Sequence, residues 1–402
     1  MSKLTLIVAG HICLDVIPAL PYTQQHLSQL LVPGGLVKTG PVTVATGGTV
    51  PNTGLALHRL GMPVRLMGKV ADDILGQIIL DTLRSYGPDL ADDMLIAPGE
   101  HSSYTVILSS PKVDRTFLHY PGPNDTFCAA DVPDTRFEGA SLFHFGYPPL
   151  MRRMYVDDGR ELATLFRRVK AHGLVTSLDM TRPDPNSEAG RVHWKTWLSN
   201  VLPHVDVFLP SLEEILFMLD RPRFQALEHQ AEETNILTLI DGEILAELSR
   251  QLLAFGVAIA GIKLGTQGLY LRTTADNTRL HALSTHFAFD TAAWTQRELH
   301  APTFQAHLVG TTGAGDCAIA GFLTGLARGQ SPEAALRSAV AVGACNVEAA
   351  DAISGVPTWD VVQARIQAGW EQLPVTLNLR GWGWNENQRL WIGPQDQGGQ
   401  LC

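Results

Sequence analysis

Residues 309–323 read Val-Gly-Thr-Thr-Gly-Ala-Gly-Asp-Cys-Ala-Ile-Ala-Gly-Phe-Leu, a turn of small residues that runs directly into a helical pattern. At the start of a helix several backbone N–H groups have no partner within the helix, and the helix dipole adds partial positive charge. Gly313, Ala314 and Gly315 carry little or no side chain, so this backbone can approach a phosphate group closely. The stretch therefore predicts an anion site, with Asp316 at its mouth.

The position of Asp316 asks for an explanation, because a carboxylate beside an anion site weakens phosphate binding. As a general base it would take a proton from an attacking hydroxyl group while the amides of residues 313–315 hold the transferring phosphoryl group. As a helix cap behind a flexible turn it would have no chemical role. These residues alone leave both interpretations open.

A second glycine-rich turn lies nearer the N-terminus, at Gly47-Gly48-Thr49-Val50-Pro51-Asn52, and a helical pattern follows it. Gly47 and Gly48 let backbone amides approach a polyhydroxylated ligand, and Asn52 offers both a hydrogen-bond donor and an acceptor. Glycine turns before helices are common, so this turn gains weight only in combination with the first one.

Short apolar runs alternate with segments of helical spacing along the chain. The runs lie at residues 4–10, 141–145, 174–178, 205–209 and 257–264, and the helical segments include 52–60, 76–86, 157–172 and 212–219. Apolar runs of this length are typical of strands covered on both faces. The alternation predicts a doubly wound α/β fold with a mostly parallel sheet between helices, in which ligands bind beyond the carboxyl ends of the strands.

Two regions interrupt this alternation. Residues 12–44 are rich in Pro and Gly, and residues 104–120 carry β-type residues around a turn. We expect a small β-flap lid with segments within 12–45 and 100–125; surface loops and an edge hairpin are the alternative. Residues 1–374 then form one domain, and residues 375–402, with three of the eight tryptophans, form a C-terminal appendage.

Composition and charge narrow the function classes. The 402 residues are 45% hydrophobic and 17% charged, as in a globular protein. A formal net charge of -10 argues against a nucleic-acid partner, which needs a basic face. The five cysteines form no close pair, the first twenty residues lack the features of an export signal, and no run of 18 apolar residues occurs. We therefore expect a cytoplasmic protein with no membrane partner.

Taken together, the two glycine-rich segments resemble the signatures of the PfkB-type carbohydrate kinases, the ribokinase-like family. The first segment, from Gly47-Gly48 through Asn52 to Asp73-x-x-Gly76, is similar to the family's N-terminal signature. Residues 310–316 are similar to its C-terminal signature, Asp-Thr-x-Gly-Ala-Gly-Asp. The resemblance covers residues 4–370 and implies the ribokinase-like fold, with ATP and Mg²⁺ as cofactors.

The resemblance also implies roles for single residues. It makes Asp316 the general base and gives Asp15 a role in holding sugar hydroxyl groups, together with the Gly47, Gly48 and Asn52 of the second turn.

For the nucleotide, the resemblance assigns Lys263, Gly265, Gly268 and Thr311 to ATP. Glu214 corresponds to a glutamate that organises Mg²⁺ and phosphate in the family, although a serine precedes it where the family has asparagine.

Several positions depart from the ribokinase pattern. Gly310 replaces an aspartate that helps to bind a monovalent cation in potassium-activated members. Cys13, Thr49 and Gly146 stand where sugar sites often carry asparagine, lysine and glutamate. A pocket without three hydroxyl partners is not expected to hold ribose as ribokinase does.

The sequence thus predicts ATP-dependent phosphorylation of a hydroxymethyl group on a small sugar or sugar-like substrate. A nucleoside kinase on the same fold and a non-catalytic sugar- or nucleotide-binding sensor are the alternatives. The turn at residues 10–13 lacks the G-x-G-x-x-G of a dinucleotide enzyme, and no G-x-x-x-x-G-K-[ST] of a P-loop enzyme occurs. Because family members often pair through the flap, a homodimer is a further expectation.

Overall fold

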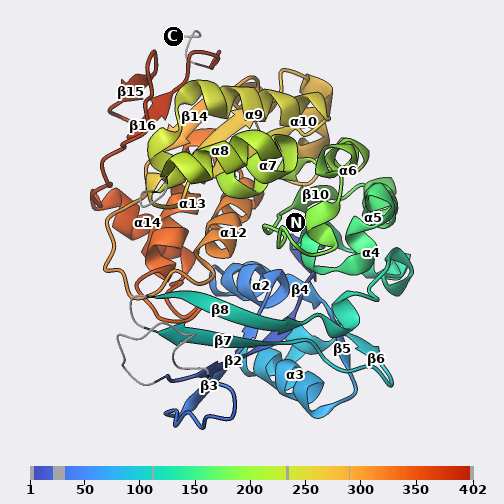
Figure 1. Ribbon diagram of the computed structural model, residues 1–402. Coiled ribbons are helices and arrows are strands. Elements are labelled where there is room, and N and C mark those ends of the chain that lie inside the picture. Colours follow the sequence, from blue (N-terminus) through green and yellow to red (C-terminus); the bar gives the residue numbers. More distant parts are fainter. Residues whose placement is uncertain (1–3, 21–31, 111–112, 232–234, 289, 399–402) are drawn as a thin grey trace.

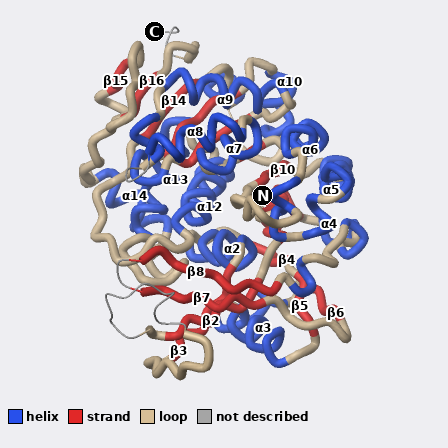
Figure 2. Tube along the Cα trace, in the orientation of Figure 1, coloured by secondary structure: helices blue, strands red, loops and turns tan. Residues whose placement is uncertain are grey.

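The computed structural model of the protein describes residues 4–20, 32–110, 113–231, 235–288 and 290–398. Its centre is a ten-stranded sheet (Figures 1 and 2). Six neighbouring strands pair in parallel, in the order β4 (Val64–Met67), β1 (Thr5–Gly10), β9 (Ala140–Gly146), β10 (Val175–Leu178), β11 (Val207–Phe208) and β12 (Ile259–Lys263). The sheet continues with antiparallel pairing through β13 (Leu269–Thr273), β14 (Glu298–Ala301), β16 (Leu390–Ile392) and β15 (Gly383–Asn385).

Helices cover both faces of this sheet. Strand β1 shows why, because Leu6 and Val8 are fully buried in the core of one face and Ile7 and Ala9 in the core of the other. The first core is completed by α2 (Thr49–Arg59), α3 (Ile74–Tyr86), α10 (Asn277–Ser284), α11 (Thr291–Trp294), α12 (Ala314–Ala327), α13 (Pro332–Asn346) and α14 (Trp359–Gln367). The second is completed by α4 (Arg152–Tyr155), α5 (Arg160–Ala171), α6 (Trp194–Val201), α7 (Leu212–Leu219), α8 (Arg221–Ala231) and α9 (Gly242–Ala254). This is the doubly wound arrangement that the alternating pattern predicted.

A second sheet forms a flap at the carboxyl end of β1. Its order is β3 (Val42–Gly47), β2 (Cys13–Pro18), β7 (Tyr104–Ser110) and β8 (Val113–Tyr120). Residues His11 and Ile12 alone separate β1 from β2, so the flap follows directly from a central strand. Figure 1 shows its strands beside α2 and α3, and β5 (Lys69–Ala71) pairs with β6 (Leu95–Ala97) nearby. Residues 21–31 and 111–112 of the expected lid segments lie outside the described residues.

The C-terminal segment continues the main sheet. Strand β16 pairs with β14, and β15 pairs with β16. Side-chain contacts hold the end of this segment in place, since Arg297 Nε donates to Asp396 Oδ2 at 2.9 Å and the Gln395 amide donates to Glu298 Oε2 at 2.8 Å. The segment therefore covers the edge that β14 would otherwise expose.

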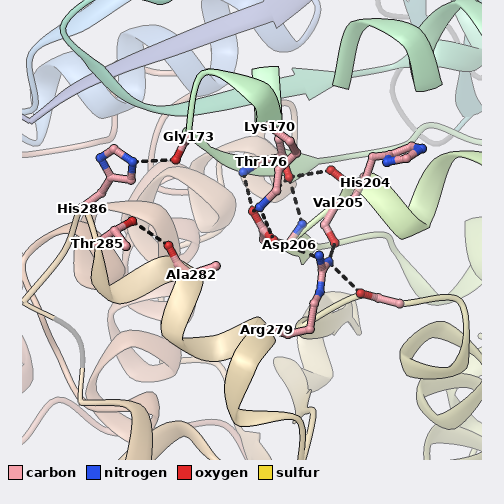
Figure 3. A network of polar contacts seen from close by, with 11 residues as sticks. Lys170, Gly173, Thr176, His204, Val205, Asp206, Arg279, Ala282, Thr285 and His286 are labelled. Atoms are coloured by element: carbon pink, nitrogen blue, oxygen red, sulfur yellow. Dashed lines mark hydrogen bonds and ion pairs between the residues drawn. The ribbon is translucent and has the colours of Figure 1, made fainter. Parts of the chain in front are cut away.

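A buried carboxylate joins the amino ends of the neighbouring strands (Figure 3). Asp206, which precedes β11, is fully buried, and its Oδ2 accepts from Lys170 Nζ at 2.7 Å and from the Thr176 amide at 2.9 Å. Arg279 of α10 lies 3.5 Å from its Oδ1. Because an ionised carboxylate is stable in a protein interior only with such partners, this network fixes α5, α10 and the strand ends relative to one another.

No helix in the described part of the chain is both long enough and apolar enough to span a membrane.

Candidate active site

The turn that opens α12 has the exposed backbone that its small residues predicted. Gly313 is the N-cap, with a φ of 73°, a conformation that favours glycine. A Cβ at this position would also collide with the carbonyl of Ala352. Gly313, Ala314 and Gly315 line a cavity of about 610 Å³ at the carboxyl ends of the strands. The structure thus brings the backbone amides of the helix start to a space large enough for a ligand.

Asp316 lies in the same helical turn and lines the same cavity. Its side chain accepts three hydrogen bonds: Asn52 Nδ2 donates to Oδ2 at 3.1 Å, Thr53 Oγ1 donates to Oδ1 at 3.3 Å, and the Tyr147 hydroxyl donates to Oδ2 at 2.8 Å. The first two partners come from α2, so the two glycine-rich segments meet at this carboxylate. Asn52 is therefore a direct neighbour of Asp316.

The environment of Asp316 makes it a stronger base than an exposed aspartate. The residue is 3% exposed, and burial raises the pKa of its carboxyl group. The charge of Lys263 and the three hydrogen bonds oppose this shift but do not cancel it. A carboxylate with a raised pKa, held by donors at a cavity wall, is suited to accept a proton from a ligand hydroxyl group.

An acidic cluster with a shared lysine forms the adjoining wall. Asp179, directly after β10, accepts from Lys263 Nζ at 2.6 Å. Burial raises the pKa of Asp179; Lys263 opposes the shift, and Glu214 and Asp316 add to it. Burial disfavours the charged form of Lys263, but the same three carboxylates raise its pKa above the ordinary value. The lysine is thus held as a cation among several carboxylates.

Glu214 has a structural contact in addition to its place in this cluster. It is the third residue of α7, and its Oε2 accepts from the Ser211 amide at 2.6 Å. Ser211 Oγ in turn accepts from the Glu214 amide at 3.3 Å, which completes a capping box. Ser211, which stands where the family has asparagine, therefore still caps the start of α7. Glu214 lines the cavity.

The residues that the sequence assigned to ATP lie around this cavity. Lys263, Gly265, Gly268 and Thr311 all line it. Gly268 has a φ of 96°, and a Cβ there would collide with the carbonyl of Ala301, so the turn after β12 requires glycine. A Cβ on Gly315 would instead lie 3.6 Å from Lys263 Nζ, an ordinary contact distance.

The substrate residues predicted from the sequence lie where the flap joins α2. Asp15 is on β2, and a Cβ on Gly47 would collide with its carboxylate, so glycine leaves this side chain room. Gly48 has a φ of 98°, and a Cβ on it would collide with His11. Burial raises the pKa of Asp15, against hydrogen bonds from Cys13 and Thr105.

The departures at Thr49 and Gly146 have a common cause. Gly146 ends β9, and a Cβ on it would collide with the side chain of Thr49. With Thr49 in this place, position 146 has no room for the glutamate that sugar sites often carry. Tyr147 follows with a φ of 62°, and this left-handed turn directs its hydroxyl to Asp316.

Gly310 also packs closely. A Cβ there would lie 2.9 Å from the carbonyl oxygen of Ala349 and 3.0 Å from that of Ala350, so an aspartate would not fit without a backbone shift. The packing around position 310 therefore suits glycine and not the aspartate that helps to bind a monovalent cation in potassium-activated members.

One part of the N-terminal signature serves the fold. Asp73 caps α3 and accepts from the Gly76 amide at 2.8 Å and from the Ser102 amide at 2.9 Å. A Cβ on Gly76 would collide with the carbonyl of Ala71. The spacing of Asp73 and Gly76 is therefore explained by the helix start alone.

Sequence reasoning missed two residues of the site. Asp179 and Tyr147 each come directly after a central strand, where ligand-binding side chains of such sheets gather. For Asp179 this position was a usable signal, because a carboxylate follows an apolar run. For Tyr147 the contact depends on a left-handed turn that the sequence does not specify.

A doubly wound sheet, a β-flap at its carboxyl edge and an aspartate at a glycine-rich helix start define the ribokinase-like class of small-molecule kinases. The sequence profile described as pfkB family carbohydrate kinase matches residues 4–359, so the chain belongs to this family and is a carbohydrate kinase.

Individual proteins agree with this assignment. An uncharacterized sugar kinase of Archaeoglobus fulgidus is 23% identical over 303 residues, which cover 75% of this chain and 98% of the relative. The 2-dehydro-3-deoxygluconokinase of Bacillus subtilis is 24% identical over 345 residues, covering 83% and 90%. The crystal structure of a fructokinase with bound ATP from Xylella fastidiosa has a TM-score of 0.66 at 18% identity, covering 92% of this chain and 99% of the other, which shows the fold.

Proposed function

We propose that this carbohydrate kinase transfers the γ-phosphoryl group of ATP to a hydroxymethyl group of a small sugar or sugar acid, with Asp316 as the general base. The observation that carries the proposal is the buried Asp316 carboxylate, which is held by Asn52 and Tyr147 at the start of α12. Its raised pKa and its place on the cavity wall both favour proton abstraction.

The residues around the cavity fit ATP. The amides of residues 313–315 would hold the transferring phosphoryl group, and Lys263 would contribute a positive charge beside them. Gly265, Gly268 and Thr311 would hold the remaining nucleotide, and the base would lie against the apolar wall of Val340, Gly343 and Ala344.

The donor set also fits Mg²⁺, which prefers oxygen ligands and keeps several waters. Glu214 would organise the ion, and Asp179 is a second carboxylate on the same wall. When bound, Mg²⁺ neutralises charge on the phosphates. Asp179, Glu214 and Asp316 outnumber the single cation Lys263, so these carboxylates would also stabilise the positive charge of the ion.

The chemical step follows from these positions. Asp316 accepts the proton of the substrate hydroxyl group, and the substrate oxygen forms its bond to phosphorus as the bond to ADP breaks. The amides at the helix start hold the oxygens of the transferring group throughout. Closure of the flap as a lid would exclude water, which otherwise competes as the acceptor.

On the substrate side we propose that Asp15 and the amides of Gly47 and Gly48 bind hydroxyl groups of the sugar. The half-buried position of Asp15 beside Gly47 supports this role. Cys13 and Gly146 remove polar partners common in ribose sites, and the Bacillus subtilis relative bears the name of a sugar-acid kinase. A sugar acid is therefore included in the proposed substrate class.

We further propose that two copies pair through the flap. The flap carries exposed apolar side chains, among them Val44, Leu118 and Tyr120. Sedimentation equilibrium of wild type and Leu118→Asp tests this; the variant should be monomeric where the wild type is dimeric.

A panel of hexoses, pentoses, sugar acids and nucleosides tests the proposed function, with ADP release and the mass of the phosphorylated product as readouts. One sugar or sugar acid should drive ADP release and gain a phosphoryl group, and Asp316→Asn should lose this activity while it still binds ATP. Turnover with nucleosides alone would overturn the substrate class. ATP or sugar binding without any turnover would overturn catalysis and favour a sensor.

A further inference from the structure

Two histidines and a cysteine meet where the flap joins the central sheet. His11 lies between β1 and β2, Cys13 is the first residue of β2, and His119 lies on β8. One ring nitrogen of each histidine and the Cys13 Sγ all lie within 4.8 Å of one another. The ring centroids of the two histidines are 5.3 Å apart.

His11 supplies an independent sign that this cluster takes a ligand. The side chain is 2% exposed, and neither ring nitrogen has a hydrogen-bond partner in the described part of the chain. A buried polar group without a partner is destabilising, so such groups call for a specific explanation. A bound ligand that uses one of these nitrogens provides it.

The donor types identify the class of ligand. Two imidazoles and one thiolate suit a borderline divalent ion such as Zn²⁺, whereas Mg²⁺ and Ca²⁺ prefer oxygen. Zinc bonds of about 2.0–2.3 Å place tetrahedral donors roughly 3–4 Å apart, so the cluster needs only a small contraction. This chemistry separates the cluster from the proposed Mg²⁺ position at Glu214.

Neighbouring side chains hold two of the donors. Thr105 Oγ1 lies 3.0 Å from Nδ1 of His119 and 3.5 Å from the Cys13 Sγ. The Cys13 thiol donates to Asp15 Oδ1 at 3.3 Å. Partners of this kind orient metal ligands in protein sites. His119 is exposed, which leaves a path for an ion to enter.

We propose that His11, Cys13 and His119 form a binding site for a divalent metal ion of borderline softness, represented by Zn²⁺. On binding, the S–H bond of Cys13 breaks, sulfur bonds to the metal, and the proton passes to Asp15 and on to solvent. Water completes the coordination. Because His119 is on β8 and His11 adjoins β1, the ion links the flap to the central sheet. This inference goes beyond the kinase function and does not depend on it.

Cobalt titration of the full chain tests the site, since Zn²⁺ has no d–d spectrum and Co²⁺ bound to a thiolate absorbs by charge transfer. Wild-type protein should give a saturable charge-transfer band at one equivalent of Co²⁺, and Zn²⁺ should displace it. Cys13→Ser should lose the band. His119→Ala should weaken Co²⁺ binding by at least about tenfold. Loss of a residue that only hydrogen-bonds to a metal ligand already lowers metal affinity by about that factor, and His119 is a proposed ligand itself.

Two matched variants serve as controls. Cys128→Ser removes a partly exposed thiol elsewhere, and His193→Ala removes an exposed imidazole at the start of α6. Both should titrate as wild type. His119 is exposed, so its variant keeps the proposal testable even if the buried Cys13→Ser change disturbs folding. Absence of a saturable band in the wild type, or a band unchanged in Cys13→Ser or His119→Ala, would overturn the proposal.

Discussion

The Tyr147 hydroxyl donates to Asp316 Oδ2 at 2.8 Å, from a residue whose φ of 62° places it in the left-handed region. Non-glycine residues adopt this conformation rarely, and strained positions of this kind are enriched at functional sites. The turn is held because Gly146 packs against Thr49 of α2. Tyr147 is therefore positioned by the same helix that supplies Asn52 and Thr53 to the carboxylate.

This contact predicts a shift in the pH dependence of the kinase. The Tyr147 hydrogen bond lowers the pKa of Asp316, so Tyr147→Phe should raise that pKa further. Because the base must be ionised, the acidic limb of the kcat/KM profile should move to higher pH, by about one unit for a charge-assisted bond. Tyr155→Phe, which removes a hydroxyl 3.4 Å from Glu188 elsewhere, should leave the profile in place. An unmoved limb in Tyr147→Phe would show that the bond does not control Asp316.

The Lys263–Asp179 pair predicts a stability effect that depends on both partners. Lys263→Met leaves buried carboxylates without their cation and should lower the free energy of unfolding by about 3–5 kcal/mol. Adding Asp179→Asn removes one of these charges, so the double variant should regain part of the loss. Urea unfolding of the single and double variants measures this coupling. Equal stability of Lys263→Met and the double variant would contradict the pairing.

Two glycines of the same turn should respond differently to alanine. A Cβ on Gly315 meets Lys263 at ordinary contact distance, so Gly315→Ala should fold with an unchanged Tm. It should still lower kcat/KM for ATP, by about 10²-fold for a displacement near 1 Å, because the methyl group stands between the backbone and phosphate. Gly313→Ala should lower the Tm, since its φ is 73° and Ala352 leaves no room. The idea fails if Gly315→Ala retains full activity.

The Asp206 network lies at the opposite ends of the strands and should affect stability alone. Asp206→Ala leaves Lys170 and Arg279 without their buried partner and should lower the free energy of unfolding by about 3–5 kcal/mol. The KM for ATP should stay at the wild-type value. The exposed Asp81→Ala should leave the free energy of unfolding close to the wild-type value. Equal free energies of unfolding for Asp206→Ala and Asp81→Ala would show that the network contributes little to stability.

The sequence predicted those parts of the structure that local patterns determine. Residues 4–10 are apolar without alternation because both faces of β1 are buried, and the helical spacing of residues 212–219 matches the bounds of α7. The strand expected at 205–209 is shorter, with only Val207–Phe208 paired on the ladder. Its neighbour Asp206 still bonds to both adjacent segments, since its amide donates to the Thr176 carbonyl at 3.0 Å and its own carbonyl accepts from the Ile259 amide at 2.8 Å. Its side chain adds the contact with the Thr176 amide.

Contacts between distant residues were beyond this reasoning. Asn52 and Asp316 lie 264 positions apart, and only the packing of α2 against α12 brings them together. Asn52, which the sequence predicts to hold sugar hydroxyl groups, also donates to the Asp316 carboxylate. The role of residues 383–392 as sheet strands was equally inaccessible, because β16 is only three residues long and its tryptophan-rich pattern is typical of no particular element.

The most direct test of Asp316 as the general base is single-turnover phosphoryl transfer, measured by rapid quench with ATP and the acceptor found in the panel. Asp316→Asn should slow the chemical step by about 10²–10⁴-fold while the dissociation constant for ATP stays at the wild-type value. A variant that transfers the phosphoryl group at the wild-type rate would contradict the account and leave Asp316 with a structural role only, through its hydrogen bonds to Asn52, Thr53 and Tyr147.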